Sequence, residues 1–438
     1  MQEKIDMMNI QTQDTDLKSL PKAEPVQVQE RIEVLDVIRG FALLGVLMAN
    51  MAWFSSPALY FEILGKDMWT GAWDTTTSSF INLLVSGKFY SMFSFLFGLG
   101  FAIFFERAME RTVKPKLLFY RRLFILLLIG LAHAFFIWYG DILVTYALLG
   151  FLLPLFFNRK PKTLIKWAIS LFSILILFLA LVMGSLALGR MFNEAAITDS
   201  LQPFYADIES MIESSFHAYG QGTFAEIMAQ RTSDTLFSFS QIFMGIFVIF
   251  PLFLLGLYAG KKKIFQNIES NLTSIRKIWI WSLVIGLTMS VVKFIFKNLM
   301  GADFYSFYTV IHTGSGFLGD IGLCLFFMTS IVLLYQNRKW MLKLKPLAYM
   351  GRMPLSNYLF QSIVCTTIFY SYGFGLYGKV GSALGLVLTV VIFTIQIFIS
   401  KYWFKHYRFG PVEWVWRCLT YGKLFGMKLT EKNKIIKI

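Results

Sequence analysis

The sequence predicts an all-α protein, a polytopic transmembrane helical bundle of about ten spans with both termini in the cytoplasm. Hydrophobic residues make up 56% of the 438 residues and charged residues only 15%, with a mean hydropathy of +0.59. Apolar stretches near the ~20 residues that cross a bilayer recur along the chain. The basic residues between them gather in alternate connections, as the positive-inside rule describes for cytoplasmic loops.

Ten apolar segments account for most of the chain. In the second of them, Gly87, Lys88 and Tyr90 interrupt the apolar run, so both one kinked helix and a re-entrant pair stay open there. The predicted segments run approximately over residues 35–53, 78–105, 118–139, 141–157, 163–187, 236–259, 275–297, 311–335, 346–370 and 381–401.

The orientation follows from four basic connections, at about residues 107–122, 159–166, 261–263 and 338–345. If the spans alternate, all four lie on one side of the membrane, and this side is the cytoplasm. A basic inner surface that faces anionic lipid accounts for the formal net charge of +15,. We therefore expect the lipid bilayer as a partner, no nucleic acid, and a multi-pass location in the cell membrane.

The flanking regions and the longest connection differ in composition from the spans. Residues 1–30 are polar, lack the features of a signal peptide and predict a disordered cytoplasmic tail,. The transmembrane domain covers residues 31–408 and includes an acidic extracytoplasmic cap loop at 188–237. Residues 409–438 form a cytoplasmic juxtamembrane tail whose aromatic and basic start is expected on the inner membrane surface.

Several classes of site receive no support from the sequence. Cys324 and Cys365 lie in apolar segments and Cys418 in the tail, so neither a disulfide nor a metal site is predicted,. A Gly-rich phosphate loop is lacking, which disfavours an ATP-driven pump. No tightly bound cofactor is expected, and the oligomeric state, including a homo-oligomer, stays open.

The first apolar segment contains Asp36, Arg39 and Asn50. At 100° per helical residue, the three side chains fall within roughly 60° of one another and can share a protein-facing side. An ionisable pair inside a membrane indicates a functional site. The alternative is a structural pair, in which the two charges only neutralise each other.

A histidine in the third segment is the candidate general base. His133 follows Arg122 by eleven positions, about three helical turns, so both lie on one face,. The turn after Trp138 brings Asp141 within reach of the imidazole, which the carboxylate would orient and make more basic. A neutral histidine that only joins two helices by a hydrogen bond is the alternative.

Two further places carry polar residues with unusual positions. Asp74 precedes the second segment and Lys88 interrupts it, and an ammonium at that depth needs a partner or a wet cavity,. Arg352, Asn357 and Gln361 form a polar stripe on the ninth segment. Both groups are candidates for substrate binding, whereas interfacial anchoring and interhelical hydrogen bonding are the structural alternatives.

The motifs at residues 35–45, 87–98, 133–143, 351–358 and 410–417 together resemble the YeiB family of bacterial multi-span membrane proteins. This resemblance covers nearly the whole chain after the first 30 residues. More distantly, the first span resembles integral-membrane acyltransferases that move acyl groups from coenzyme A to envelope sugars.

The distant resemblance implies a catalytic pattern from which this chain departs. In those acyltransferases a histidine follows the arginine after ten intervening residues, whereas Asn50 occupies that position here. The first span also resembles the heparan acetyltransferases, which have asparagine there and a histidine in the next outer loop. This chain has no histidine in that loop, and His133 repeats the arginine-to-histidine spacing from Arg122.

Two functions are therefore predicted as alternatives. In the first, acyl-coenzyme A is a co-substrate that approaches the basic cytoplasmic face near Arg39 and Arg352, and the acyl group passes near His133 to an envelope glycan or lipid. This requires a tunnel that joins the two faces. In the second, the same polar residues bind and release a small solute or lipid without covalent chemistry.

Overall fold

The computed structural model of the chain describes residues 31–112, 114–301 and 305–429. Within these ranges the protein is helical and no β-strand forms, which confirms the all-α prediction. A single antiparallel bridge joins Tyr407 to Lys428. The predicted tail at residues 1–30 and residues 430–438 of the predicted C-terminal tail lie outside the described residues.

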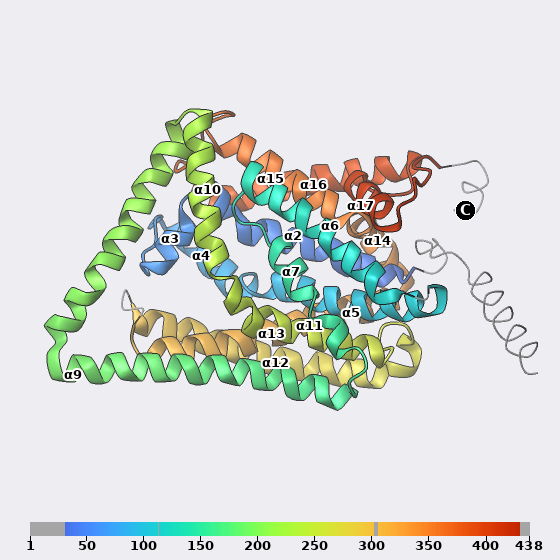
Figure 1. The fold of residues 1–438 in the computed structure, drawn as a ribbon, viewed down its shortest axis with the longest axis horizontal. Coiled ribbons are helices and arrows are strands. Elements are labelled where there is room, and N and C mark those ends of the chain that lie inside the picture. The colour runs from blue at the N-terminus through green and yellow to red at the C-terminus, as the bar shows by residue number, and fades with distance from the viewer. Residues whose placement is uncertain (1–30, 113, 302–304, 430–438) are drawn as a thin grey trace, which may run out of the picture.

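Helices follow one another closely along the described chain (Figure 1). Those of the first half are α2 (Glu33–Ser55), α3 (Ala58–Ile63), α4 (Ala72–Leu84), α5 (Lys88–Arg111), α6 (Pro115–Phe136), α7 (Leu143–Gly150), α8 (Leu153–Phe156), α9 (Pro161–Gln221) and α10 (Phe224–Ser240). After the short 3-10 helix η2 (Ile242–Met244) come α11 (Gly245–Lys261), α12 (Ile268–Met300), α13 (Tyr308–Tyr335), α14 (Arg338–Arg352), α15 (Pro354–Phe369), α16 (Ser382–His406) and α17 (Pro411–Tyr421).

Eight stretches of described helix are long and apolar enough to cross a membrane. Two of them, the first half of α9 and α12, bury only 11% and 17% of their apolar windows inside the protein. Their exposed side chains include Leu177 and Leu181 on α9 and Trp281 and Val284 on α12. Apolar surface of this extent needs an apolar solvent, so the chain is a membrane protein whose α9 and α12 face lipid.

The two remaining predicted segments form shorter helices. Residues 141–157 give α7 and α8, and residues 346–370 give α15 together with the end of α14. Helix α15 has 16 residues, of which Gln361, Ser362, Cys365 and others are buried. A helix enclosed by protein is not required to match the bilayer thickness, because its neighbours satisfy its polar groups.

The basic connections lie at one end of the bundle, which we call the inner end. Lys263 forms an ion pair with Glu106 at 3.2 Å, and Lys261 donates hydrogen bonds to the carbonyl oxygens of Phe157 and Arg159. The start of α2, together with α14 and α17, lies at the same end, on the right in Figure 1. We call the opposite end, where α3 lies, the outer end.

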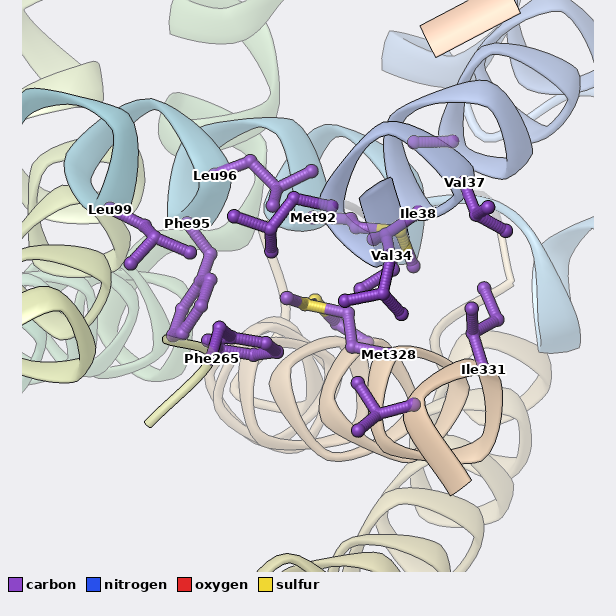
Figure 2. Packing of buried hydrophobic residues seen from close by; sticks show 14 of the residues in the cluster. Val34, Val37, Ile38, Met92, Phe95, Leu96, Leu99, Phe265, Met328 and Ile331 are labelled. Atoms are coloured by element: carbon purple, nitrogen blue, oxygen red, sulfur yellow. The ribbon is translucent and has the colours of Figure 1, made fainter. Parts of the chain in front are cut away.

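A buried apolar cluster ties α2 to α5 and α13 (Figure 2). Val34 and Ile38 of α2 meet Met92 of α5 and Met328 of α13, and each of these side chains is at most 2% exposed. Lipid is as apolar as these side chains, so close van der Waals packing stabilises the contact more than transfer out of water does. The cluster fixes the positions of three helices that line the cavity described below.

Helix α2 also lies against α14 with backbone close to backbone. A side chain at Gly351 would place its Cβ 1.8 Å from the carbonyl oxygen of Asp36, and one at Gly40 would meet the carbonyl oxygen of Leu347 at 2.0 Å. Only glycine allows helices to approach so closely. This contact brings Arg352, the last residue of α14, to the polar start of α2.

The connection predicted as a cap loop at residues 188–237 is helical. Helix α9 continues through it to Gln221, with a kink at Asn193, whose backbone has φ −156° and ψ 87°. Helix α10 then begins with a capping box in which Thr223 and Glu226 exchange hydrogen bonds. In Figure 1 the second half of α9 runs obliquely past the outer end before α10 turns back into the bundle.

The second predicted span consists of two helices, α4 and α5, separated at Val85, Ser86 and Gly87. Gly87 has φ +88°, a backbone conformation that residues with side chains rarely adopt,. A Cβ there would also lie 1.8 Å from a carboxylate oxygen of Asp320 on α13. The break therefore depends on glycine and lies directly beside a charged residue of a neighbouring span.

Candidate functional site

A central cavity of about 950 Å³ lies between α2, α5, α6, α7, α15 and α17. Its walls include Arg352 and Arg417 from the inner end and Trp53 and Glu62 from the outer end. Between them the walls are largely aromatic, with Phe93, Phe97, Phe101 and Phe104 contributed by one face of α5. The cavity thus offers both a polar and an apolar environment along its length.

Six arginines of the described residues line the central cavity, and we call them the arginine cluster: Arg31, Arg39, Arg107, Arg122, Arg352 and Arg417. The carboxylates that line the same end are Asp36 and Glu413, which leaves a net formal charge of +4. Asp36 accepts a hydrogen bond from Arg39 at 2.7 Å, so the pair predicted on the first span forms. The surplus of guanidinium groups favours an anionic ligand.

Three members of the arginine cluster contact aromatic rings. Arg122 lies 3.9 Å from the centre of the Trp416 ring, Arg352 lies 4.1 Å from that of Phe404, and Arg417 lies 4.9 Å from that of Phe409. Among the described residues, no carboxylate comes within ion-pair distance of these three. These cation–π contacts hold the guanidinium groups in place and leave their charges available to a ligand.

Burial lowers the pKa of one member of the arginine cluster. Desolvation, reinforced by the nearby charges of Arg31 and Arg122, lowers the pKa of Arg417 to about 9. A cation held in such surroundings gains more from a bound anion than an exposed cation does, because less water is displaced when the anion arrives.

Glu413 holds α17 against the rest of the site. Its carboxylate accepts hydrogen bonds from the backbone N–H groups of Leu355 and Ser356, at 2.7 and 3.1 Å, and from the Ser356 hydroxyl at 2.5 Å. These N–H groups belong to the first turn of α15, which has no helical acceptor for them. Burial raises the pKa of Glu413, whereas these hydrogen bonds oppose the shift. The carboxylate is therefore a structural cap that positions Arg417 one turn further along α17.

His133 and Asp141 form the pair that the sequence predicts. His133 Nδ1 lies 2.6 Å from Asp141 Oδ2, and the backbone N–H of Val144 donates to Asp141 Oδ1 at 2.8 Å. Asp141 lines the central cavity, whereas His133, which is 1% exposed, lies behind it beside Tyr358. Among the described residues, His133 Nε2 has no hydrogen-bond partner. The catalytic roles of His133 and Asp141 stay predictions, because the side chains of both residues are buried, at 1% and 0% exposed.

Lys88 forms an ion pair with Asp320 at the break between α4 and α5, and Asp320 also pairs with Lys293. The Lys88 ammonium group, which is 0% exposed, lies 2.8 Å from Asp320 Oδ1 and also donates to the carbonyl oxygens of Ser86 and Asn82. Lys293 of α12 lies 3.8 Å from the other carboxylate oxygen of Asp320. Asp320 and Lys293 line the central cavity, and Lys88 lies behind them.

The outer part of the cavity carries fewer charges. Asn50 and Trp53 of α2 line it, and Glu62 of α3 lies opposite, accepting a hydrogen bond from Trp53 Nε1 at 3.1 Å. Asp36, Arg39 and Asn50, the three polar residues of the first span, therefore all face the same cavity. The helical spacing predicted this shared face.

The remaining predicted residues have partners outside the cavity walls. Asp74 accepts a hydrogen bond from the backbone N–H of Ala383 and so caps the start of α16. Asn357 donates to the carbonyl oxygen of Met350, and Gln361 donates to the Gln396 side chain at 3.0 Å. All three residues therefore join helices. For Asn357 and Gln361, interhelical hydrogen bonding is the structural alternative named for the polar stripe.

Several residues of the site escaped the sequence analysis. Asp320 lies within an apolar span, and the rule that flags intramembrane charges would have identified it. The sequence predicts a surface segment for Arg417 and Glu413, because nothing in their local sequence indicates that α17 folds back onto α6 and α15. Glu62 lies on a helix of only six residues that carries no recognisable motif.

Comparison with known proteins identifies the family. A family described as "Protein of unknown function (DUF418)" matches residues 259–423, which include Lys293, Asp320, Arg352 and Arg417. The "Uncharacterized protein YxaH" of Bacillus subtilis (strain 168) is 36% identical over 431 residues, covering 94% of this chain and 99% of that protein. The "Uncharacterized 39.9 kDa protein in amylase 3'region" of Bacillus acidopullulyticus is 28% identical over 423 residues, covering 93% of this chain and 99% of that protein. The "Uncharacterized protein YeiB" of Escherichia coli (strain K12) is 26% identical over 411 residues, covering 89% of this chain and 96% of that protein. The chain therefore belongs to the YeiB-like DUF418 family of multi-span membrane proteins.

Proposed function

We propose that this protein is an acyltransferase of the cell membrane. It binds an acyl-coenzyme A at the inner, cytoplasmic end of the central cavity and passes the acyl group to an envelope glycan or lipid that enters from the outer end. The observation that carries the proposal is one cavity with a surplus of arginines at one end and a small polar group, which includes Asn50, Glu62 and Lys293, away from that end.

The arginine cluster is suited to the phosphate groups of coenzyme A. Guanidinium groups bind phosphates through two parallel hydrogen bonds, and each bond to a charged group contributes about 1.5–3 kcal/mol. Arg122 and Arg417 are the best candidates, because each makes a cation–π contact with an aromatic ring and has no carboxylate within ion-pair distance among the described residues.

The aromatic middle of the cavity is suited to the rest of the donor. Ligand pockets for small molecules commonly measure about 300–1,000 Å³ and are mostly apolar with a few polar groups. The cavity, at about 950 Å³, falls at the upper end of this range. Its walls at Phe93, Phe97 and Leu96 can accommodate a long, weakly polar arm and an acyl chain that lead from the phosphates toward Asn50.

Binding of acetyl-coenzyme A to the purified protein in detergent tests the donor site. We expect saturable binding by calorimetry, weakened about ten- to hundredfold in Arg122→Gln and in Arg417→Gln, which corresponds to one lost charge-assisted contact. The control is Arg338→Gln, which removes an exposed arginine of the inner end that does not line the cavity. No binding to the wild type at millimolar ligand, or equal losses in all three variants, would overturn this assignment.

A transporter without covalent chemistry is the second candidate, and one observation favours it. The span formed by α4 and α5 is broken at Gly87 beside the buried charges of Lys88 and Asp320. Transporters bind ions and substrates at such broken helices near the middle of the bilayer. This function predicts that bound acetyl-coenzyme A or coenzyme A leaves chemically unchanged.

Release of free thiol distinguishes the two functions. In proteoliposomes supplied with acetyl-coenzyme A, an acyltransferase releases coenzyme A thiol in step with acylation of an acceptor on the opposite side. A transporter moves the intact thioester or another solute and releases no thiol. Thiol release that depends on Arg122 and Arg417 supports acyl transfer, and its complete absence with every acceptor supplied favours transport.

A further inference from the structure

Acyl transfer to a hydroxyl group needs a proton acceptor close to the place where acceptor and thioester meet. Carboxylates are the acidic side chains along the cavity that can take this role. Those among the described residues that line it are Asp36, Glu62, Asp141, Asp320 and Glu413.

Four of these carboxylates already have strong partners. Asp36 forms an ion pair with Arg39 at 2.7 Å, and Asp320 forms one with Lys88 at 2.8 Å. Glu413 accepts three hydrogen bonds from the start of α15. Asp141 binds His133 with one oxygen and the Val144 N–H with the other. These partners occupy the oxygens of the four carboxylates, so an acceptor hydroxyl group would have to displace one of them before it could pass its proton on.

Glu62 differs from the other four. Its Oε1 accepts a single neutral hydrogen bond, from Trp53 Nε1 at 3.1 Å, and no cation of the described residues lies within ion-pair distance. The side chain is exposed while it lines the cavity, so a molecule in the cavity can reach it. Desolvation raises the pKa of Glu62 above that of an ordinary glutamate. The Trp53 hydrogen bond and the charges of Lys297 and Lys293 on α12 oppose this shift, and the charge of Asp67 adds to it. A carboxylate with a raised pKa is a stronger base.

We propose that Glu62 is the catalytic base that activates the hydroxyl group of the acceptor. This inference rests on the proposed acyl transfer. The acceptor oxygen attacks the thioester carbonyl carbon and forms the new C–O bond while its proton moves to the Glu62 carboxylate. The C–S bond then breaks, and coenzyme A leaves as a thiolate that takes up this proton, which restores the carboxylate.

The position of Glu62 agrees with this sequence of events. Helix α3 lies at the outer end, on the side from which a glycan or lipid acceptor arrives, while the donor phosphates are bound at the arginine cluster. Trp53 holds the carboxylate through Oε1 and leaves Oε2 available. Asn50, which lines the cavity one turn before Trp53 on α2, can donate its amide hydrogen to the thioester oxygen,.

The test compares Glu62→Gln with the wild type in proteoliposomes. Radiolabelled acetyl-coenzyme A is supplied on the side of the arginine cluster, and glucose, glucosamine and glycerol are supplied as acceptors on the other side. Glutamine keeps the shape and the hydrogen bond to Trp53 but does not take up the proton. The matched control is Glu209→Gln, which removes an exposed outer carboxylate that pairs with Lys66 at 3.0 Å and does not line the cavity.

We expect Glu62→Gln to bind acetyl-coenzyme A within about twofold of the wild type and to lose about 10²–10⁴-fold in transfer rate. The wild-type rate should rise with pH through the pKa of Glu62, and this rise should be absent in Glu62→Gln. Glu209→Gln should behave as the wild type in both measurements.

Two results overturn the inference, and they differ. If the wild type transfers label and Glu62→Gln does so at a comparable rate with the same pH profile, Glu62 is not the base and the proposed function stands. If the wild type binds the donor but transfers label to none of these acceptors and releases no thiol, the proposed acyl transfer fails and the inference fails with it.

Discussion

Substitutions of the charged residues at the break between α4 and α5 should lower the stability of the protein by different amounts. The distances between the charged groups determine the order. Asp320 lies 2.8 Å from Lys88 and 3.8 Å from Lys293. With an effective dielectric constant near 20, these separations correspond to attractions of about 6 and about 4 kcal/mol before the cost of desolvation. Asp320 is therefore held by two cations, whereas each lysine has this carboxylate as its charged partner.

The consequences of each substitution follow from what remains buried. Asp320→Asn leaves two ammonium groups without a counter-charge and should cost about 5 kcal/mol, the upper end of the range for a broken buried pair. Lys88→Met leaves Asp320 with Lys293 and should cost about 3 kcal/mol. Lys293→Met should cost least, because this side chain is partly exposed and farther away,. In the double variant Lys88→Met with Asp320→Asn, only one cation stays unpaired, so this protein should be more stable than Asp320→Asn alone.

Thermal unfolding of the purified variants in detergent, followed by fluorescence-detected size exclusion, measures this order. The Lys88→Met protein should retain binding of acetyl-coenzyme A at temperatures where it is folded, because Lys88 does not line the cavity. Equal midpoints for the three single variants would refute the reasoning. A double variant that loses as much as the two single variants combined would also refute it, because the two side chains would then not interact.

The remaining predictions concern the caps and the histidine pair. Glu413→Ala should destabilise the protein by about 2–4 kcal/mol, because the donors at the start of α15 lose their acceptor, and circular dichroism melting checks this,. Because burial raises the pKa of Glu413 above 4.5, its stabilising contribution is fully present below pH 4.5 and is lost as the pH rises through the raised value,. Glu413→Gln should therefore gain stability relative to the wild type as the pH rises above 4.5, and a gap in melting temperature that stays constant with pH would contradict this. Asp74→Ala should lower stability by about 1 kcal/mol through loss of the α16 cap, with donor binding unchanged in calorimetry,. Asp141→Asn should cost about 1–2 kcal/mol by weakening the bond to His133, and a larger loss of transfer than in Glu62→Gln would favour the histidine pair as the base,.

Helical periodicity was a good guide where the relevant residues share one helix. Asp36, Arg39 and Asn50 line the same cavity, because spacings along α2 alone determine which residues share a face,. His133 and Asp141 meet because only a short turn separates α6 from α7, so the two side chains have few alternatives. The hydrogen bond was therefore predictable, whereas the depth of His133 behind the cavity wall depends on Tyr358 of a distant helix.

Contacts between distant segments could not be predicted in this way. Asp74 and Ala383 are separated by 309 positions, and the cap that they form depends on how α4 lies against α16. Similarly, the Glu413 cap joins residues 57 and 58 positions apart. A polar residue near a span looks the same in the sequence whether it binds substrate or caps a helix, because the difference lies in which helix end is nearby.

The sequence by itself determined that the chain is a helical membrane protein with its basic connections at one end. Hydropathy and the distribution of lysine and arginine are summed over many residues, so tertiary contacts do not change them. Only the tertiary structure decided which charges are neutralised and which face the cavity. Arg417 joins the arginine cluster because α17 folds back onto α6 and α15. Glu62 keeps a free oxygen because no cation of the described residues comes within ion-pair distance of it. Whether two charges form a pair depends on a separation of a few ångströms between helices that are distant in the sequence. Local sequence patterns do not determine such separations.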